Sequence, residues 1–210
     1  TSALAASLSK RGRFAAASGV PAATYGTMAT PIAVVRLRSL DAAAYAACWR
    51  SSHRSAAELV RELYLQWRAH PSAVILVKTV LGIQDAVRRG SVTLACLDRL
   101  WHGPVNATGP IRALQDAFKR VGLSFAFEAH GSLASAQARI SLTAPSTPLR
   151  DFVLQAQQEK HRRVLGFRRP DFSPIADGID RFLTLRFERS KAPESRKAAL
   201  RVVLTGGTVT

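Results

Sequence analysis

The spacing of the apolar residues changes once along the chain, and this change constrains the fold more than any other feature of the sequence. Between residues 32 and 121 apolar side chains recur at intervals of three and four, which is typical of amphipathic helices. Around Phe125 and Phe127, and again from Ala138 to Leu142, they recur at every second residue, as in strands with one buried face. The sequence therefore predicts a mainly α fold with a small β-hairpin, an α+β fold whose N-terminal half is helical and whose C-terminal half is mixed.

Helix caps and breakers divide the helical part into segments. Ser55 and Glu58 form a capping box, and Pro71 is expected to end the helix that they begin. Gly90 separates the next two helices, and Pro110 suits the first turn of another. The expected helices cover 1–26 with a break at Gly19 and Pro21 and an end near Gly26, then 32–50, 55–70, 72–89, 91–101, 110–121, 147–165 and 194–204.

The expected hairpin lies near residues 124–143. Phe125 and Phe127 alternate with small or polar residues in its first strand, and Ile140 and Leu142 do so in its second. Gly131 supplies the turn between them. The hairpin belongs to the second of two predicted regions, because a loop at 102–109 separates a helical region (1–101) from a basic mixed region (109–210). A single undivided domain is the alternative.

Length and composition allow an ordinary folded core. The chain has 210 residues, of which 47% are hydrophobic, and that is enough to bury a core of normal size. No segment approaches the roughly 18 uninterrupted apolar residues that a membrane-spanning helix needs, so no membrane span is predicted. Cys48 and Cys96 lie far apart without a CxxC pattern, which favours buried thiols over a disulfide.

The charge is strongly positive. Thirty Lys and Arg residues face fourteen Asp and Glu residues, a formal net charge of +16, and most of the cations are Arg. A surface of this kind attracts polyanions, and the planar guanidinium group suits phosphate better than an ammonium group does. The composition therefore predicts the backbone of RNA or DNA as the partner, with other protein subunits as a second class of partner.

Basic residues gather between Lys160 and Arg201, where phenylalanines interleave with them. Cations that hold phosphates and rings that stack on bases form this kind of pattern in proteins that bind single strands. The alternative is a solvated basic face with the four phenylalanines (Phe167, Phe172, Phe182 and Phe187) in the core. The predicted nucleic-acid-binding residues are Lys160, Arg162, Arg163, Arg168, Arg169 and Arg181.

No pattern typical of an active site is found. Two-metal catalysis needs converging carboxylates, and the nearest pair in a loop, Asp177 and Asp180, is better explained as a turn and a cap. The five histidines show no zinc-ligand spacing, and no GxSxG elbow is present. The sequence therefore predicts no catalytic residue, no metal site and no cofactor.

Short runs of residues along the chain also suggest a family. They are VPAATYG at 20–26, LWHGP at 100–104, GP at 109–110, RVGLSF at 120–125, RRPDF at 168–172, DGIDR at 177–181 and residues 200–207. In these runs and their order, the chain resembles the part of a non-LTR retrotransposon reverse transcriptase that follows the palm, from the late thumb onwards, in the divergent enzymes of protists. The family's paired catalytic aspartates, its fingers and palm, and its downstream Cys and His cluster have no counterpart here.

The resemblance implies a non-catalytic, nucleic-acid-associated fragment or derivative of such an enzyme, with Arg168, Arg169 and Arg181 near the template or primer backbone. The alternative is a basic structural subunit of a large assembly, such as an organellar ribosome or a membrane complex. A retroelement origin implies the nucleus or cytoplasm. The absence of acidic residues before Asp41 would instead suit mitochondrial targeting.

Overall fold

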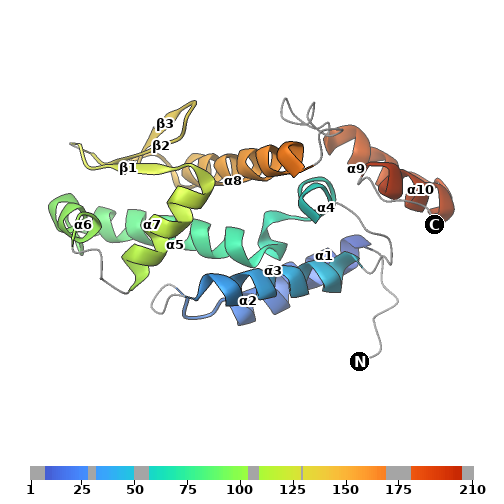
Figure 1. Cartoon of the computed structure of the whole chain (residues 1–210), viewed down its shortest axis with the longest axis horizontal. Helices are drawn as coiled ribbons and strands as arrows, with labels where there is room; N and C mark the ends of the chain where they lie inside the picture. The colour runs from blue at the N-terminus through green and yellow to red at the C-terminus, as the bar shows by residue number, and fades with distance from the viewer. Residues whose placement is uncertain are drawn as a thin grey trace. The chain divides into compact units, whose positions relative to one another are not determined.

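The structure is a computed structural model of the chain (Figure 1). It describes residues 8–27, 32–49, 57–103, 109–128, 130–168 and 181–204. Most of these residues are helical, and three short strands form one antiparallel sheet. This architecture confirms the predicted fold class, a mainly α protein with a small β element.

The helices follow the predicted order with one addition. The helix α9 was not expected from the sequence, because its apolar positions are interrupted by arginines. In chain order the helices are α1 (Leu8–Phe14), the π-helix η1 (Ala15–Gly19), α2 (Val20–Ala23), α3 (Val34–Trp49), α4 (Ala57–Tyr64), the 3₁₀ helix η2 (Trp67–Ala69), α5 (Pro71–Arg88), α6 (Leu94–Trp101), α7 (Pro110–Val121), α8 (Ser146–Arg168), α9 (Arg181–Arg189) and α10 (Glu194–Leu204).

The first helical segment passes through the two residues that were expected to break it. A proline inside an α-helix lacks an N–H donor, and its ring collides with the carbonyl four residues earlier. Here the wider π-helix η1 precedes Pro21, and the N–H of Val20 donates to the carbonyl of Ala15, five residues back. The predicted break at Gly19 and Pro21 is therefore wrong, whereas the predicted end is confirmed by the positive φ of Gly26.

The helix expected over 55–70 is shorter than its sequence pattern. It ends at Tyr64, and the chain continues through the 3₁₀ helix η2 to Pro71, which begins α5 instead of ending the helix before it. Leu59 and Leu63 are buried, as their spacing predicts. Ser55 and the side chain of Glu58, the expected capping box, lie outside the described residues.

The β element has one strand more than the expected hairpin. The strands β1 (Ser124–Ala126), β2 (Ser132–Ala134) and β3 (Arg139–Ser141) form a sheet in the order β1-β2-β3. Leu133 of the middle strand pairs with Phe125 on one side and Ile140 on the other, and it is fully buried. A three-residue strand with one central apolar residue has no alternation to detect, which is why β2 was missed.

Gly131 lies where the sequence places the turn, between β1 and β2. Its φ is +61°, a conformation that side chains rarely adopt. A Cβ added there would meet Leu94 Cδ2 at 2.8 Å and Leu142 Cδ1 at 3.1 Å. The backbone conformation therefore favours glycine here, and a side chain would also displace the ends of the Leu94 and Leu142 side chains.

The chain divides into two compact units, each assembled from separate stretches. Unit 1 comprises residues 1–23, 39–71 and 161–210, and unit 2 comprises residues 24–38 and 72–160. The predicted boundary at 102–109 falls largely outside the described residues and stays a prediction.

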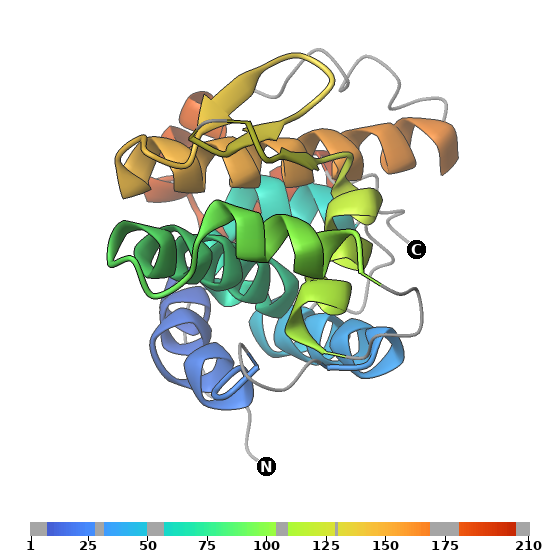
Figure 2. The same ribbon diagram turned by 90° about the vertical axis from the view of Figure 1, so that its left-hand side faces the viewer.

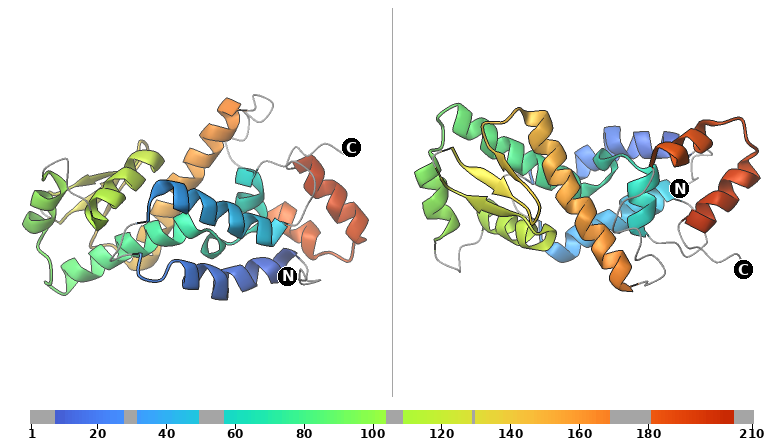
Figure 3. Two further views of the ribbon diagram at one scale, coloured as in Figure 1. Left: turned by 60° about the horizontal axis from the view of Figure 1, so that its bottom comes forward. Right: turned by 90° about the horizontal axis from the view of Figure 1, so that it is seen from above.

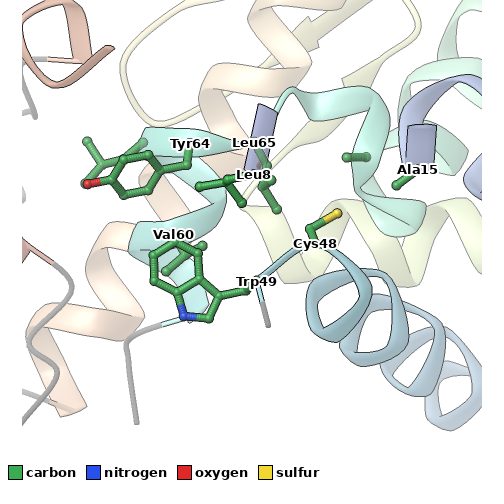
Figure 4. Close-up of a cluster of buried hydrophobic side chains, with 9 residues drawn as sticks. Leu8, Ala15, Cys48, Trp49, Val60, Tyr64 and Leu65 are labelled. Carbon is green, nitrogen blue, oxygen red and sulfur yellow. The ribbon is translucent and has the colours of Figure 1, made fainter. Parts of the chain in front are cut away.

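The core of unit 1 joins the N-terminal helices to α4 (Figure 4). The rings of Trp49 and Tyr64 lie 5.7 Å apart between centroids. Cys48 is fully buried, as predicted, whereas Cys96 of unit 2 is only partly buried, and both thiols are free. The buried members of this cluster are Leu8, Ala15, Cys48, Trp49, Val60, Leu63, Tyr64, Leu65 and Ala69.

The core of unit 2 lies among α5, α7, the sheet and α8. Phe118 and Leu114, part of the predicted stripe on α7, are buried together with Leu133 of the sheet. The sheet lies beside α8 in two different views (Figures 2 and 3), and the first part of α8 buries Leu149 and Val153. Within the described part of the chain, no helix combines the length and the apolar character that crossing a membrane requires.

Candidate nucleic-acid interface

The C-terminal end of α8 carries the first group of predicted binding residues. Lys160, Arg163 and Phe167 are all exposed, and their spacing places them on one face of the helix. Arg168, the last residue of α8, is exposed as well. Leu165 is buried on the other side of the same turns, so the end of α8 has one anchored side and one basic side.

Arg162 lies on the anchored side and forms an ion pair with Glu62 of α4. Its Nε donates to Glu62 Oε1 at 2.7 Å, and its Nη2 contacts the same oxygen. The Glu62 side chain is only 7% exposed and that of Arg162 is 21% exposed. Because a carboxylate with so little access to water needs a partner, Arg162 serves to hold α8 against α4.

The helix α9 presents a similar basic and aromatic face. Phe182, Arg186 and Arg189 are exposed and recur at intervals of four and three, which places them on one side of the helix. Thr184, on another side, is buried, and α9 packs on α4. Both α8 and α9 are thus anchored on α4 while each keeps an exposed basic face.

Arg201 of α10 binds the two carboxylates that the sequence provides between residues 181 and 204. Its Nε donates to Glu188 Oε1 at 2.8 Å, and its Nη1 donates to Glu194 Oε1 at 2.6 Å. Burial alone would lower the pKa of Arg201, but the hydrogen bonds and charges of Glu188 and Glu194 outweigh it and raise that pKa. Arg201 thus balances one of the two negative charges of α9 and α10, and the exposed cations Arg186, Arg189, Lys191 and Arg196 outnumber the charge that is left.

The predicted binding residues therefore fall into three groups. Lys160, Arg163 and Arg168 are exposed on α8, and Arg162 is occupied by Glu62. Arg169 and the side chain of Arg181 lie outside the described residues. The prediction did not select Arg186 and Arg189 of α9, although their helical spacing from Phe182 was a signal that could have found them.

The exposure of the phenylalanines decides between the two interpretations of this segment. Phe167 is 91% exposed and Phe182 is 72% exposed, so these two are not core residues. Phe187 is partly buried, and Phe172 lies outside the described residues. The idea that all four phenylalanines belong to the core is therefore wrong for the two whose exposure is highest.

A second group of aromatic residues, in unit 2, is packed differently. The ring of Trp101 lies 5.6 Å from Phe118, 5.5 Å from Phe125 and 6.0 Å from Phe127, measured between centroids. Phe125 and Phe127 stack at 4.5 Å. These rings pack against one another and close the space between α6, α7 and β1, as aromatic residues do in a core.

No described group of three His, Cys, Asp or Glu residues is placed to hold a metal ion. Asp177 and Asp180 lie outside the described residues. No family model matches the sequence, and neither a curated protein nor a solved structure matches it. The functional argument therefore depends on the residues of this chain.

Proposed function

We propose that the protein binds the phosphate backbone of RNA or DNA, without catalysis of its own, through the exposed basic faces of α8 and α9. The observation that carries the proposal is the distribution of charge over the described parts of α8, α9 and α10. The carboxylates Glu188 and Glu194 are bound by Arg201, while Lys160, Arg163, Arg186 and Arg189 are exposed. A phosphate that approaches these faces meets cations in excess, since the sequence between Lys160 and Arg201 has twelve basic residues against five acidic ones.

Sequence preference is expected to be weak, because contacts to phosphates carry no information about the bases. The guanidinium group of Arg can donate two parallel hydrogen bonds to a phosphate, and Arg supplies most of the cations on these faces. The resemblance to the post-palm part of a retrotransposon reverse transcriptase belongs to the same proposal, since that region lies near the template and primer. Extending the reading frame upstream, to look for a palm with paired aspartates, would test it.

The proposed function is tested by the salt dependence of binding. Each phosphate contact to a single strand contributes about −0.7 to the slope of log K against log salt. We expect the wild type to bind a labelled single-stranded RNA with a steep slope, and a quadruple variant to flatten that slope by roughly 2 to 3. The variant is Lys160→Gln, Arg163→Gln, Arg186→Gln and Arg189→Gln.

A control variant with the same change in net charge separates these faces from the charge of the whole protein. It replaces four exposed cations of α3, α5 and α6, and its slope should stay near that of the wild type. Equal flattening in both variants would refute a defined interface. No flattening in either would favour the alternative, a structural subunit whose basic residues face other proteins. The control is Arg36→Gln, Arg38→Gln, Lys78→Gln and Arg99→Gln.

A further inference from the structure

Phe167 and Phe182 lie on the two basic helix faces, each four residues from an exposed arginine. Phe167 follows Arg163 by four residues on α8, and Phe182 precedes Arg186 by four residues on α9. Residues four apart are neighbours on a helix surface. Each ring therefore lies one turn from an exposed arginine.

Neither phenylalanine is engaged with another ring among the residues that the structure describes. The rings around Trp101 in unit 2 have neighbours at 4.5 to 6.0 Å, whereas Phe167 and Phe182 are open to solvent. Isolated apolar residues are common on protein surfaces and by themselves indicate nothing. Phe14 of α1 is also exposed, at 61%. What distinguishes Phe167 and Phe182 is that both lie on the helix faces that the proposed function assigns to the nucleic-acid backbone.

A ring beside a cation fits a ligand that has flat apolar faces and regularly spaced negative charges. Single-stranded nucleic acid is such a ligand, because its phosphates follow the cations and its unpaired bases can stack on aromatic side chains. In a duplex the bases are already stacked on each other and present only their edges. The positive charge of the two faces thus favours nucleic acid as the ligand, and the exposed rings favour single strands over duplexes.

We propose that Phe167 and Phe182 are base-stacking residues that make the protein selective for single-stranded over double-stranded nucleic acid. This inference rests on the proposed function, since stacking requires that the cations hold the backbone nearby. It goes further by assigning a role to two residues that contact no phosphate. The exposed phenylalanines should therefore affect affinity for bases and leave the electrostatic contribution unchanged.

The test measures the binding of three labelled ligands of equal length: a single-stranded RNA, an abasic strand with the same phosphates, and a duplex. For the double variant Phe167→Ala and Phe182→Ala we expect a loss of about 25-fold or more on the single strand, because stacking contributes at least about fivefold for each ring. Affinity for the abasic strand and the duplex should not change. The salt slope should also be unchanged, since no phosphate contact is removed.

Two control variants separate stacking from other causes. Tyr25→Ala removes an aromatic side chain that is 91% exposed in a turn of unit 2, and it should leave all three affinities unchanged. Phe167→Leu with Phe182→Leu keeps apolar side chains but removes the rings, and it should lose nearly as much affinity as the alanine variant. Circular dichroism should show the wild-type helix content for each variant, since exposed side chains are replaced.

The possible failures are distinguishable. If wild-type protein binds the abasic strand as tightly as the normal strand, stacking is refuted while the proposed function stands. An equal loss of affinity of the double alanine variant for all three ligands would also refute stacking. If the double alanine variant lost binding to vesicles of anionic lipid and kept its binding to RNA, a membrane surface would be the ligand of these rings, and base stacking would be refuted. Absence of binding to every nucleic acid would overturn both proposals together.

Discussion

Two buried polar side chains, one in each unit, differ in how they are satisfied. In unit 2, the Gln84 side chain is fully hydrogen-bonded: Nε2 donates to the carbonyls of Leu142 and Ala144 at 2.7 Å, and Oε1 accepts from Ser146 at 2.9 Å. In unit 1, the Tyr64 hydroxyl is buried without a partner among the described residues. A neutral amide thus joins α5 to the start of α8, whereas the ion pairs with little exposure to solvent, Arg162–Glu62 and Arg201–Glu188, lie in unit 1.

The same contrast shows why net charge overstates the binding surface. Arg88 donates to the carbonyls of Thr143 and Ala144 in unit 2, and Arg162 and Arg201 are occupied by carboxylates in unit 1. These arginines contribute to the formal charge of +16 but serve the fold. The charge available to a polyanion is what remains after such internal pairs are set aside.

The largest effect is expected from Arg162→Gln, which leaves Glu62 of unit 1 poorly solvated and without its cation. Removing one partner of a buried ion pair costs about 3 kcal/mol of the free energy of unfolding, at the lower end of the usual range because Arg162 keeps some exposure. Urea denaturation would measure this as a lower midpoint with an unchanged slope.

The neighbouring substitution Arg163→Gln is the matched control, because it removes the same charge from the exposed side of the same turn. It should change the free energy of unfolding by less than about 0.5 kcal/mol. If the two variants were equally stable, the ion pair between Arg162 and Glu62 would not be what holds α8 to α4, and the contrast between the units would lose its main support.

Sequence spacing predicted the elements whose apolar stripe is long. The helices α5, α7 and α8 have enough turns to show a period, and the glycines and prolines near their ends are local signals. The elements that were missed are short or depend on distant contacts. β2 has a single buried apolar residue, Leu133, and the helical path through Pro21 depends on a π turn that no local pattern indicates.

The sequence predicted which segment carries the candidate site, but it predicted less well which residues of that segment are available to bind a ligand. A cluster of cations can be read from the sequence, but nothing in the sequence pairs Arg162 with Glu62, one hundred residues away. The exposure of Phe167 and Phe182 also could not be read, since a phenylalanine is apolar whether it packs or not. α9 could have been found, because Phe182, Arg186 and Arg189 share a helical spacing.

An intermediate effect is expected in unit 2 from Gln84→Met, which keeps the size of the side chain and removes its hydrogen bonds. The carbonyls of Leu142 and Ala144 would lose a buried donor, so the free energy of unfolding should fall by about 2 kcal/mol. The loss should be the same at low and high salt, because no charge is involved. A salt-dependent loss would show that this junction too is electrostatic.

The smallest effect at neutral pH is expected from Tyr64→Phe in unit 1. The hydroxyl that it removes is buried and has no hydrogen-bond partner, so the variant should be as stable as the wild type or slightly more stable. This is the opposite of Gln84→Met, although both replace a buried polar side chain by an apolar one. A loss above about 1 kcal/mol would mean that the Tyr64 hydroxyl has a partner in solution.

The same variant separates from the wild type at alkaline pH. Burial, and then the charge of Glu188, raise the pKa of Tyr64 above its ordinary value of 10.0, although Arg201 acts in the opposite direction. The pKa of Tyr64 is therefore higher in the folded protein than in the unfolded chain. Below pH 10 the tyrosine is protonated in both states, and its ionisation costs the folded protein no stability. Above that pH the unfolded chain loses its proton first, and stability falls by about 1.4 kcal/mol for each pH unit.

Urea denaturation between pH 9 and 11 should show this loss in the wild type. Tyr64→Phe should lose this contribution and keep the one from Cys48, whose pKa burial also raises. Parallel curves for the two proteins would refute a buried, neutral Tyr64.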